Sequence, residues 1–145
     1  MSALISQSSI TTSMANQLAT AICNDASHQG LKICVSVLDR YGYPLAFLRM
    51  NGAPLHSIQI AEDKAFTAIS FGLATHIWQE RLKENGHLRQ TLSQQPRMLM
   101  IGGGLPLHVN DELVGAIGVS GASEQQDIDC ARTGLTLFFA ETQDA

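Results

Sequence analysis

The stretch from residue 98 to residue 121 constrains the fold of this chain more than any other part of it. Two apolar runs, at 105–109 and 113–120, flank the polar residues Asn110-Asp111-Glu112. Apolar runs on either side of a short polar turn predict a β-hairpin. The chain should therefore contain an antiparallel pair of strands in its C-terminal half.

Glycines stand at both ends of this hairpin. Gly102, Gly103 and Gly104 precede it, and Ser120-Gly121 follows it just before a predicted helix. Glycine has no Cβ and adopts positive φ, so each end allows a ligand or another backbone segment to approach closely. A tight bend that involves no ligand is the alternative interpretation of the three consecutive glycines.

The remaining chain alternates between helix and strand patterns. We predict helices at 8–30, 57–72, 75–84 and from Ser123 onward, strands at 32–38, 45–50 and 97–101 beside the hairpin, and a loop at 87–97. This order predicts a mainly antiparallel sheet of about five strands. Strands that are apolar on both sides imply helices on both faces, so the predicted fold class is α/β in the mixed (α+β) sense.

Three local signals fix the ends of these helices. Ser57 and Thr75 are predicted N-caps, because their hydroxyls can accept from the free amides of a first helical turn. Ser123 with Gln126 three residues later is a capping-box pattern. The helix at 57–72 also carries a stripe of mainly small residues, which would let it lie close against the sheet: Ile58, Ala61, Ala65, Ala68 and Gly72.

Composition excludes several classes of partner. The formal net charge is −4 with no cluster of Lys or Arg, which argues against nucleic acid binding. The apolar runs are too short to span a bilayer, and residues 1–13 carry no signal-peptide pattern, so we expect a cytoplasmic protein. Only 15% of residues are charged, which favours a homo-oligomer with part of its surface buried. Cys23, Cys34 and Cys130 are predicted to be reduced core residues.

The residues offer one candidate pocket and no strong catalytic motif. The five histidines share no chelating spacing. His56 precedes the second helix and, like His108, is either a structural residue or a functional one, such as a haem-iron ligand. Lys64 is either a surface side chain or a source of positive charge for an anionic ligand. The full candidate pocket is His56, Lys64, Gly102, Gly103, Gly104, Ser120 and Gly121, where Ser120-Gly121 could offer free amides to an anion.

Five blocks carry a family resemblance. The segments at 35–53 (VSVLDRYGYPLAFLRMNGA), 61–68 (AEDKAFTA), 102–106 (GGGLP), 114–121 (VGAIGVSG) and 127–131 (DIDCA) closely resemble the GlcG/HbpS family. That family also supplies the C-terminal domain of propanediol-utilisation-type cobalamin adenosyltransferases. The likeness covers nearly the whole chain in the right order, so residues 1–145 are expected to form a single domain of this family. It implies a profilin-like three-layer sandwich and a homo-oligomer from tetramer to octamer.

The resemblance also implies a function. Some members bind haem, so it implies a cytoplasmic accessory protein that binds haem or a related tetrapyrrole or corrinoid in glycerol- or propanediol-type metabolism. His56 would then be the iron ligand. Two alternatives stay open: a structural or interaction subunit, and a small enzyme acting on a carboxylate- or phosphate-bearing metabolite. The chain shows no nucleophile–base pair, which disfavours the enzyme.

Overall fold

The computed structural model describes residues 2–142 as a four-stranded antiparallel sheet with five helices. The elements are α1 (Thr12–His28), β1 (Cys34–Asp39), β2 (Pro44–Arg49), α2 (His56–Phe71), α3 (Ile77–Arg81), α4 (Gly86–Ser93), β3 (Gly104–Val109), β4 (Glu112–Ser120) and α5 (Glu124–Thr142). The predicted α+β class and the predicted hairpin at 105–120 are confirmed, and the strands predicted at 32–38 and 45–50 form a second hairpin.

The strand order is β2-β1-β4-β3, so each hairpin contributes one central and one edge strand. The two hairpins join where β1 pairs with β4, in a register that places Cys34 opposite Ser120. At the tip of the second hairpin, Asn110 and Asp111 adopt φ of 50° and 64°. Two successive residues with positive φ form the turn whose twist matches that of paired strands.

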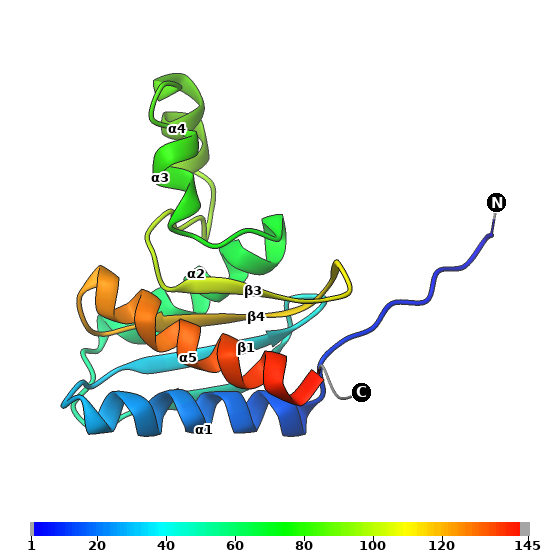
Figure 1. Cartoon of the computed structure of the whole chain (residues 1–145). Coiled ribbons are helices and arrows are strands. Elements are labelled where there is room, and N and C mark those ends of the chain that lie inside the picture. The colour runs from blue at the N-terminus through cyan, green and yellow to red at the C-terminus, as the bar shows by residue number, and fades with distance from the viewer. Residues whose placement is uncertain (1, 143–145) are drawn as a thin grey trace.

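Helices cover both faces of the sheet, as the sequence predicts. Helices α1 and α5 pack together on one face, and α2 packs on the other against β4, β1 and β3 (Figure 1). Side chains of β1 alternate between the two faces. Val35 and Val37 belong to the core under α1 and α5, whereas Cys34 and Leu38 lie on the face of the sheet that α2 covers. Both kinds of side chain are buried, so the strand is apolar on both sides.

The predicted fifth strand at 97–101 is wrong. Arg97 has a φ of 64°, which a strand residue does not adopt, and the Thr67 hydroxyl of α2 donates to the Arg97 carbonyl at 2.9 Å. The same hydroxyl accepts from the Leu99 amide at 2.9 Å. Because these backbone groups are bonded to a helix side chain, the segment lies along α2 instead of joining the sheet.

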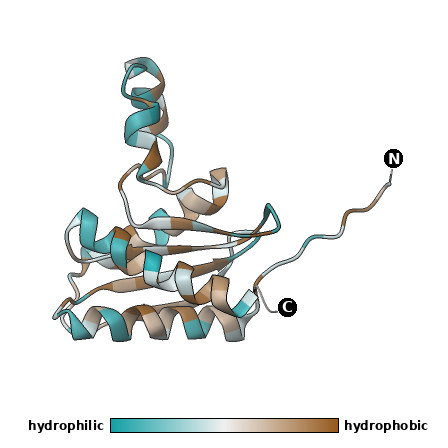
Figure 2. Cartoon of the chain, in the orientation of Figure 1, coloured by the Kyte–Doolittle hydropathy of each residue, from teal (hydrophilic) through white to brown (hydrophobic). Residues whose placement is uncertain are grey.

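The predicted loop at 87–97 is also wrong, because most of it is helix α4. Asn85-Gly86 directly follows the predicted helix at 75–84, which is typical of a helix end, but the Asn85 side chain accepts from the Leu88 amide at 3.1 Å and so begins a helix. Helix α4 is short and has no buried residue, and its large apolar side chains are Leu88 and Leu92, which are too few to predict a helix from the sequence. Together α3 and α4 form an arm that projects from the sheet and is hydrophilic at its tip (Figures 1 and 2).

Three other helix starts differ from the prediction. Thr75 does not cap α3, which begins at Ile77, because Thr75 Oγ1 accepts from the Gly104 amide at 2.9 Å. Helix α1 begins at Thr12 with Thr11 as its cap, and the Ser8 amide and Ser9 hydroxyl bond instead to Glu112 and Arg40. Helix α2 begins at His56, and the Ser57 hydroxyl donates to the Pro54 carbonyl. The capping box at Ser123 and Gln126 is confirmed by reciprocal bonds of 3.1 and 3.2 Å. Within residues 2–142, no helix has the length and apolar character needed to cross a membrane.

Candidate functional site

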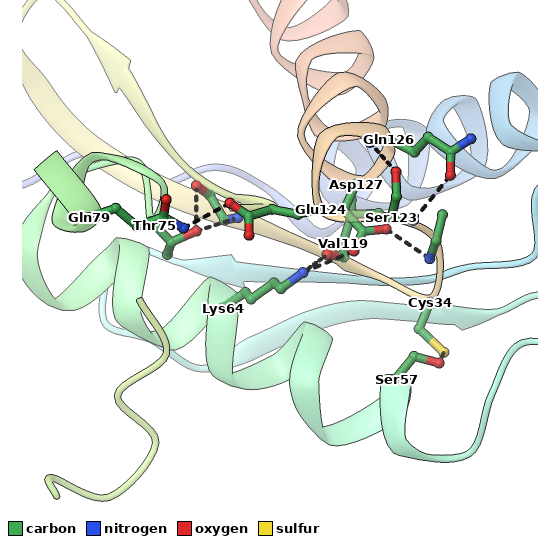
Figure 3. Close-up of polar contacts among 12 residues, drawn as sticks. Cys34, Ser57, Lys64, Thr75, Gln79, Val119, Ser123, Glu124, Gln126 and Asp127 are labelled. Atoms are coloured by element: carbon green, nitrogen blue, oxygen red, sulfur yellow. Dashed lines mark hydrogen bonds and ion pairs between the residues drawn. The ribbon is translucent and has the colours of Figure 1, made fainter. Parts of the chain in front are cut away.

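The middle of α2 carries a buried ion pair. The Lys64 ammonium donates to Asp127 Oδ2 at 3.0 Å and to the Val119 carbonyl at 2.9 Å (Figure 3). The two charged side chains are only 3% and 4% exposed. The expectation of a surface lysine is therefore wrong, and the ammonium is engaged by the protein itself.

Asp127 extends this network to the start of α5. Its Oδ1 atom accepts from the Ala122 amide at 3.0 Å, while Oδ2 accepts from Lys64. Burial raises the pKa of the Asp127 carboxyl above its ordinary value, and the Lys64 ammonium and the Ala122 amide oppose that shift only in part. The network joins α2, the end of β4 and the start of α5.

The three glycines lie against this network. A Cβ on Gly103, whose φ is 126°, would stand 2.5 Å from the Val119 carbonyl oxygen and 2.8 Å from Lys64 Nζ. A Cβ on Gly104 would stand 2.5 Å from the Lys64 carbonyl oxygen, and one on Gly102 would stand 2.4 Å from Ile128. The sequence allows either a ligand or another part of the chain to approach these glycines. In the structure, the chain's own backbone and side chains lie against them.

Ser120 and Gly121 are likewise packed within the protein. Ser120 is 5% exposed, and a Cβ on Gly121 would stand 2.6 Å from the Lys32 carbonyl oxygen. The two amides that follow, of Ala122 and Ser123, already donate to Asp127 and Gln126. These two amides at the start of α5 are therefore bonded to side chains of the same helix.

His56 lies apart from the other candidate residues. It is exposed at the first turn of α2, eight residues before Lys64. At a rise of about 1.5 Å per residue, that separation is about 12 Å along the helix. The structure thus brings Lys64 together with the glycines and leaves His56 at the helix end. His108, on β3, is half-buried.

An open groove lies beside α2, over the edge strand β2. Its volume is about 400 Å³, and it is lined by Ser36, Leu38, Gly42, Pro44, Phe47, Gln59, Glu62 and Arg97. Phe47 pairs with Ser36 in the sheet, so both side chains lie on the α2 face. Because α2 packs on β4, β1 and β3, it leaves β2 only partly covered on this side.

His56 does not line this groove, but it lies one helical turn before Gln59 of the groove wall. It precedes Gln59 by three residues on α2, and residues three apart lie on the same side of a helix. The groove therefore has an apolar floor, a carboxylate and an amide on its helical wall, and an imidazole one turn away.

Arg97 closes the other side of the groove and was not singled out from the sequence. Its Nε atom donates to Asp63 Oδ1 at 2.9 Å, and its guanidinium carbon lies 3.9 Å from the centre of the Phe66 ring. Both partners are on α2, more than thirty residues earlier in the chain. In the sequence, Arg97 follows a proline within a polar stretch. No neighbouring residue indicates that its side chain lies against α2.

Comparison with known proteins settles the family. Residues 10–136 match the family model described as haem degrading protein HbpS-like. The chain belongs to the HbpS-like family. This HbpS-like chain is 34% identical over 130 residues to an uncharacterized 15.0 kDa protein in the dhaT-dhaS intergenic region of Citrobacter freundii, covering 89% of this chain and 92% of that protein.

A second relative is longer. The corrinoid adenosyltransferase PduO of Salmonella typhimurium is 32% identical over 124 residues, which are 85% of this chain but only 37% of PduO. The HbpS-like chain thus spans little more than a third of that relative.

Two solved structures share the fold over nearly their whole length. ORFY of Klebsiella pneumoniae has a TM-score of 0.90 at 33% identity, with 97% of each chain covered. The complex described as PduOC:Heme has a TM-score of 0.82 at 30% identity, with 88% of this chain and 94% of the other covered.

Proposed function

We propose that this HbpS-like protein is an accessory protein that binds haem or a related tetrapyrrole in the groove between α2 and β2. The observation that carries the proposal is the groove itself, with an apolar floor, a charged wall and an imidazole one helical turn beyond that wall. Its volume of about 400 Å³ falls in the range of small-molecule pockets. The likeness to the haem complex of PduOC supports the choice of ligand class.

The groove residues fit the chemistry of a tetrapyrrole. A flat apolar ring can lie against Leu38, Pro44 and Phe47. The Arg97 guanidinium uses its Nε–H for Asp63, so its remaining N–H groups can donate to a carboxylate substituent of the ring. Haem, when bound, would supply the iron chemistry, and the protein's part is to hold and orient it.

His56 is the proposed iron ligand. Neutral imidazole is the usual protein ligand of haem iron. The His56 side chain is exposed at the first turn of α2, one turn before Gln59 of the groove wall. An exposed imidazole can turn toward the groove at little cost in packing.

A haemin titration of the purified protein tests the proposal. We expect a sharp Soret band that saturates near one haem per chain, and weakening by at least tenfold in His56→Ala. His28→Ala is the matched control, because His28 is also exposed but lies at the end of α1. Gln59→Trp places a bulky ring on the helical wall of the groove. It should block haem binding while leaving His56, the proposed iron ligand, unchanged.

The outcomes separate the parts of the proposal. A featureless titration that does not saturate would contradict haem binding and leave the interaction subunit or the small enzyme as the function. Saturable haemin binding that is unchanged in both His56→Ala and Gln59→Trp would show that haem binds outside the groove. Loss in Gln59→Trp alone would keep the groove and remove His56 as ligand.

The wider setting is also part of the proposal. Relatives named for the dhaT-dhaS intergenic region and for corrinoid adenosyltransferase support a place in glycerol- or propanediol-type metabolism. We propose a cytoplasmic homo-oligomer of four to eight copies. Exposed apolar side chains such as Tyr41, Tyr43 and Leu55 support association between copies. Sedimentation velocity with and without haemin measures the number of copies.

A further inference from the structure

A second cavity lies inside the arm formed by α3 and α4, and the proposed function does not use it. Its volume is about 630 Å³. It shares no lining residue with the groove between α2 and β2. It is therefore a separate feature that needs its own explanation.

The cavity has one apolar and one polar side. Trp78, Leu82 and Met100 supply apolar surface, and Arg89 and Gln90 of α4 supply hydrogen-bond donors. Gln79 also lines it, but its amide nitrogen already donates to Glu124 at 2.9 Å. No Asp or Glu is among the described residues that line the cavity, so its own charge is positive.

Arg89 is free to bind a ligand. Within residues 2–142, its guanidinium forms no ion pair or side-chain hydrogen bond, whereas Arg97 and Arg132 are each paired with an aspartate. A guanidinium is always charged and presents several N–H donors in one plane, which match the two oxygens of a carboxylate.

Trp78 provides a second sign that the arm is incomplete. The residue is 7% exposed, and its indole Nε1 is buried without an acceptor among the described residues. The ring of Phe71 packs against it edge-on, with 4.9 Å between ring centres. Buried donors in folded proteins are nearly always paired, so the unpaired indole Nε1 marks Trp78 as a residue whose surroundings within the arm are incompletely bonded.

We propose that the arm cavity binds a small organic anion with an aromatic body. The carboxylate pairs with Arg89, with Gln90 as a second donor, and the ring packs between Trp78, Leu82 and Met100. Binding joins α3 to α4, which otherwise buries no residue of its own. The proposal is independent of haem binding.

The chain contains a single tryptophan, so fluorescence excited selectively from tryptophan reports on Trp78 alone. We would titrate the protein with benzoate, with benzyl alcohol, which has the ring without the charge, and with acetate, which has the charge without the ring. We expect a saturable change in emission with benzoate, and at least tenfold weaker binding of the other two. The thermal midpoint should rise with benzoate concentration, because the ligand binds the folded state.

Two arginine variants make the test specific. Arg89→Gln should weaken benzoate binding at least tenfold. Arg81→Gln is the matched control, because Arg81 is exposed on α3 and does not line the cavity. Both variants should bind haemin as the parent protein does, which keeps this proposal distinguishable from the proposed function.

Two results would overturn the proposal. One is a titration in which benzoate changes neither the Trp78 emission nor the thermal midpoint of unfolding. The other is benzoate binding of equal strength in Arg89→Gln and in the parent protein.

Discussion

Lys64 and Asp127 are 63 residues apart in the sequence, yet their charged atoms lie 3.0 Å apart where α2, β4 and α5 meet. The pair is almost completely buried. Removal of one partner would leave the other charge in a poorly solvated place. Substitutions at Lys64, Gly103, Thr67 and Cys130 test how such buried groups stabilise the fold.

Lys64→Met should destabilise the fold strongly. Breaking a buried pair from one side costs about 3–5 kcal/mol, because the remaining Asp127 carboxylate has lost its counter-charge. The free energy of unfolding in urea measures the effect. Arg132→Met is the control: it breaks the exposed Arg132–Asp129 pair and should cost less than about 1 kcal/mol. Equal losses in the two variants would mean that burial of the pair has no energetic weight.

Gly103→Ala should also destabilise the protein, by about 3 kcal/mol, because the new Cβ meets Val119 and Lys64 at a positive φ. Gly86→Ala is the matched control, since a Cβ there meets nothing within 4 Å. Gly86 is also the first residue of α4, where alanine favours the helix by up to about 1 kcal/mol. Urea unfolding of both variants gives the comparison. A Gly103→Ala protein as stable as the parent would show that the glycine bend is not tightly packed.

Thr67→Val should loosen the segment that carries Arg97. The variant keeps the shape of the side chain but loses the bonds to the Arg97 carbonyl and the Leu99 amide. We expect a loss of about 1–3 kcal/mol and faster hydrogen exchange of the Leu99 amide. Thr91→Val is the control, because the Thr91 hydroxyl bonds only within the exposed helix α4. Unchanged exchange at Leu99 would contradict the role of Thr67.

Stability should fall in alkaline solution because of Cys130. This thiol is fully buried, and burial raises its pKa from 9.0 to about 11. Between these values the unfolded chain releases the proton while the folded protein keeps it, so the free energy of unfolding decreases as the pH rises. Two pKa units correspond to about 2–3 kcal/mol.

Cys130→Ala isolates this effect from the titration of other groups. The free energies of unfolding of the parent and the variant, measured in urea from pH 8 to pH 11, should converge or cross as the pH rises. A difference between the two proteins that stays constant over this range would show that the Cys130 thiol ionises normally in the fold.

Much of the fold could be predicted because its signals are local. The positive φ at Gly30 and Gly72 coincides with the helix ends predicted at residues 30 and 72. The apolar runs of both hairpins are likewise contained in short stretches of chain. Helix α4 escaped prediction because it buries nothing, and Asn85 can either end one helix or begin another.

The candidate site depended on distant pairs and could not be predicted as well. Burial of Lys64 requires Asp127, and the position of Arg97 requires Asp63 and Thr67. No spacing within a single helix or strand encodes such pairs. The sequence therefore identified Lys64 as a candidate residue without indicating its partner, and the groove lined by Arg97 became visible only in three dimensions.

Thr75 and Gly104, which flank the arm and the segment that lies along α2, exchange two hydrogen bonds of 2.9 Å, from the Thr75 amide to the Gly104 carbonyl and from the Gly104 amide to Thr75 Oγ1. The 29-residue separation between them is thus closed at its base. The entropy of closing a loop grows only slowly with its length. Insertions or deletions at the tip of the arm should therefore leave the sheet intact.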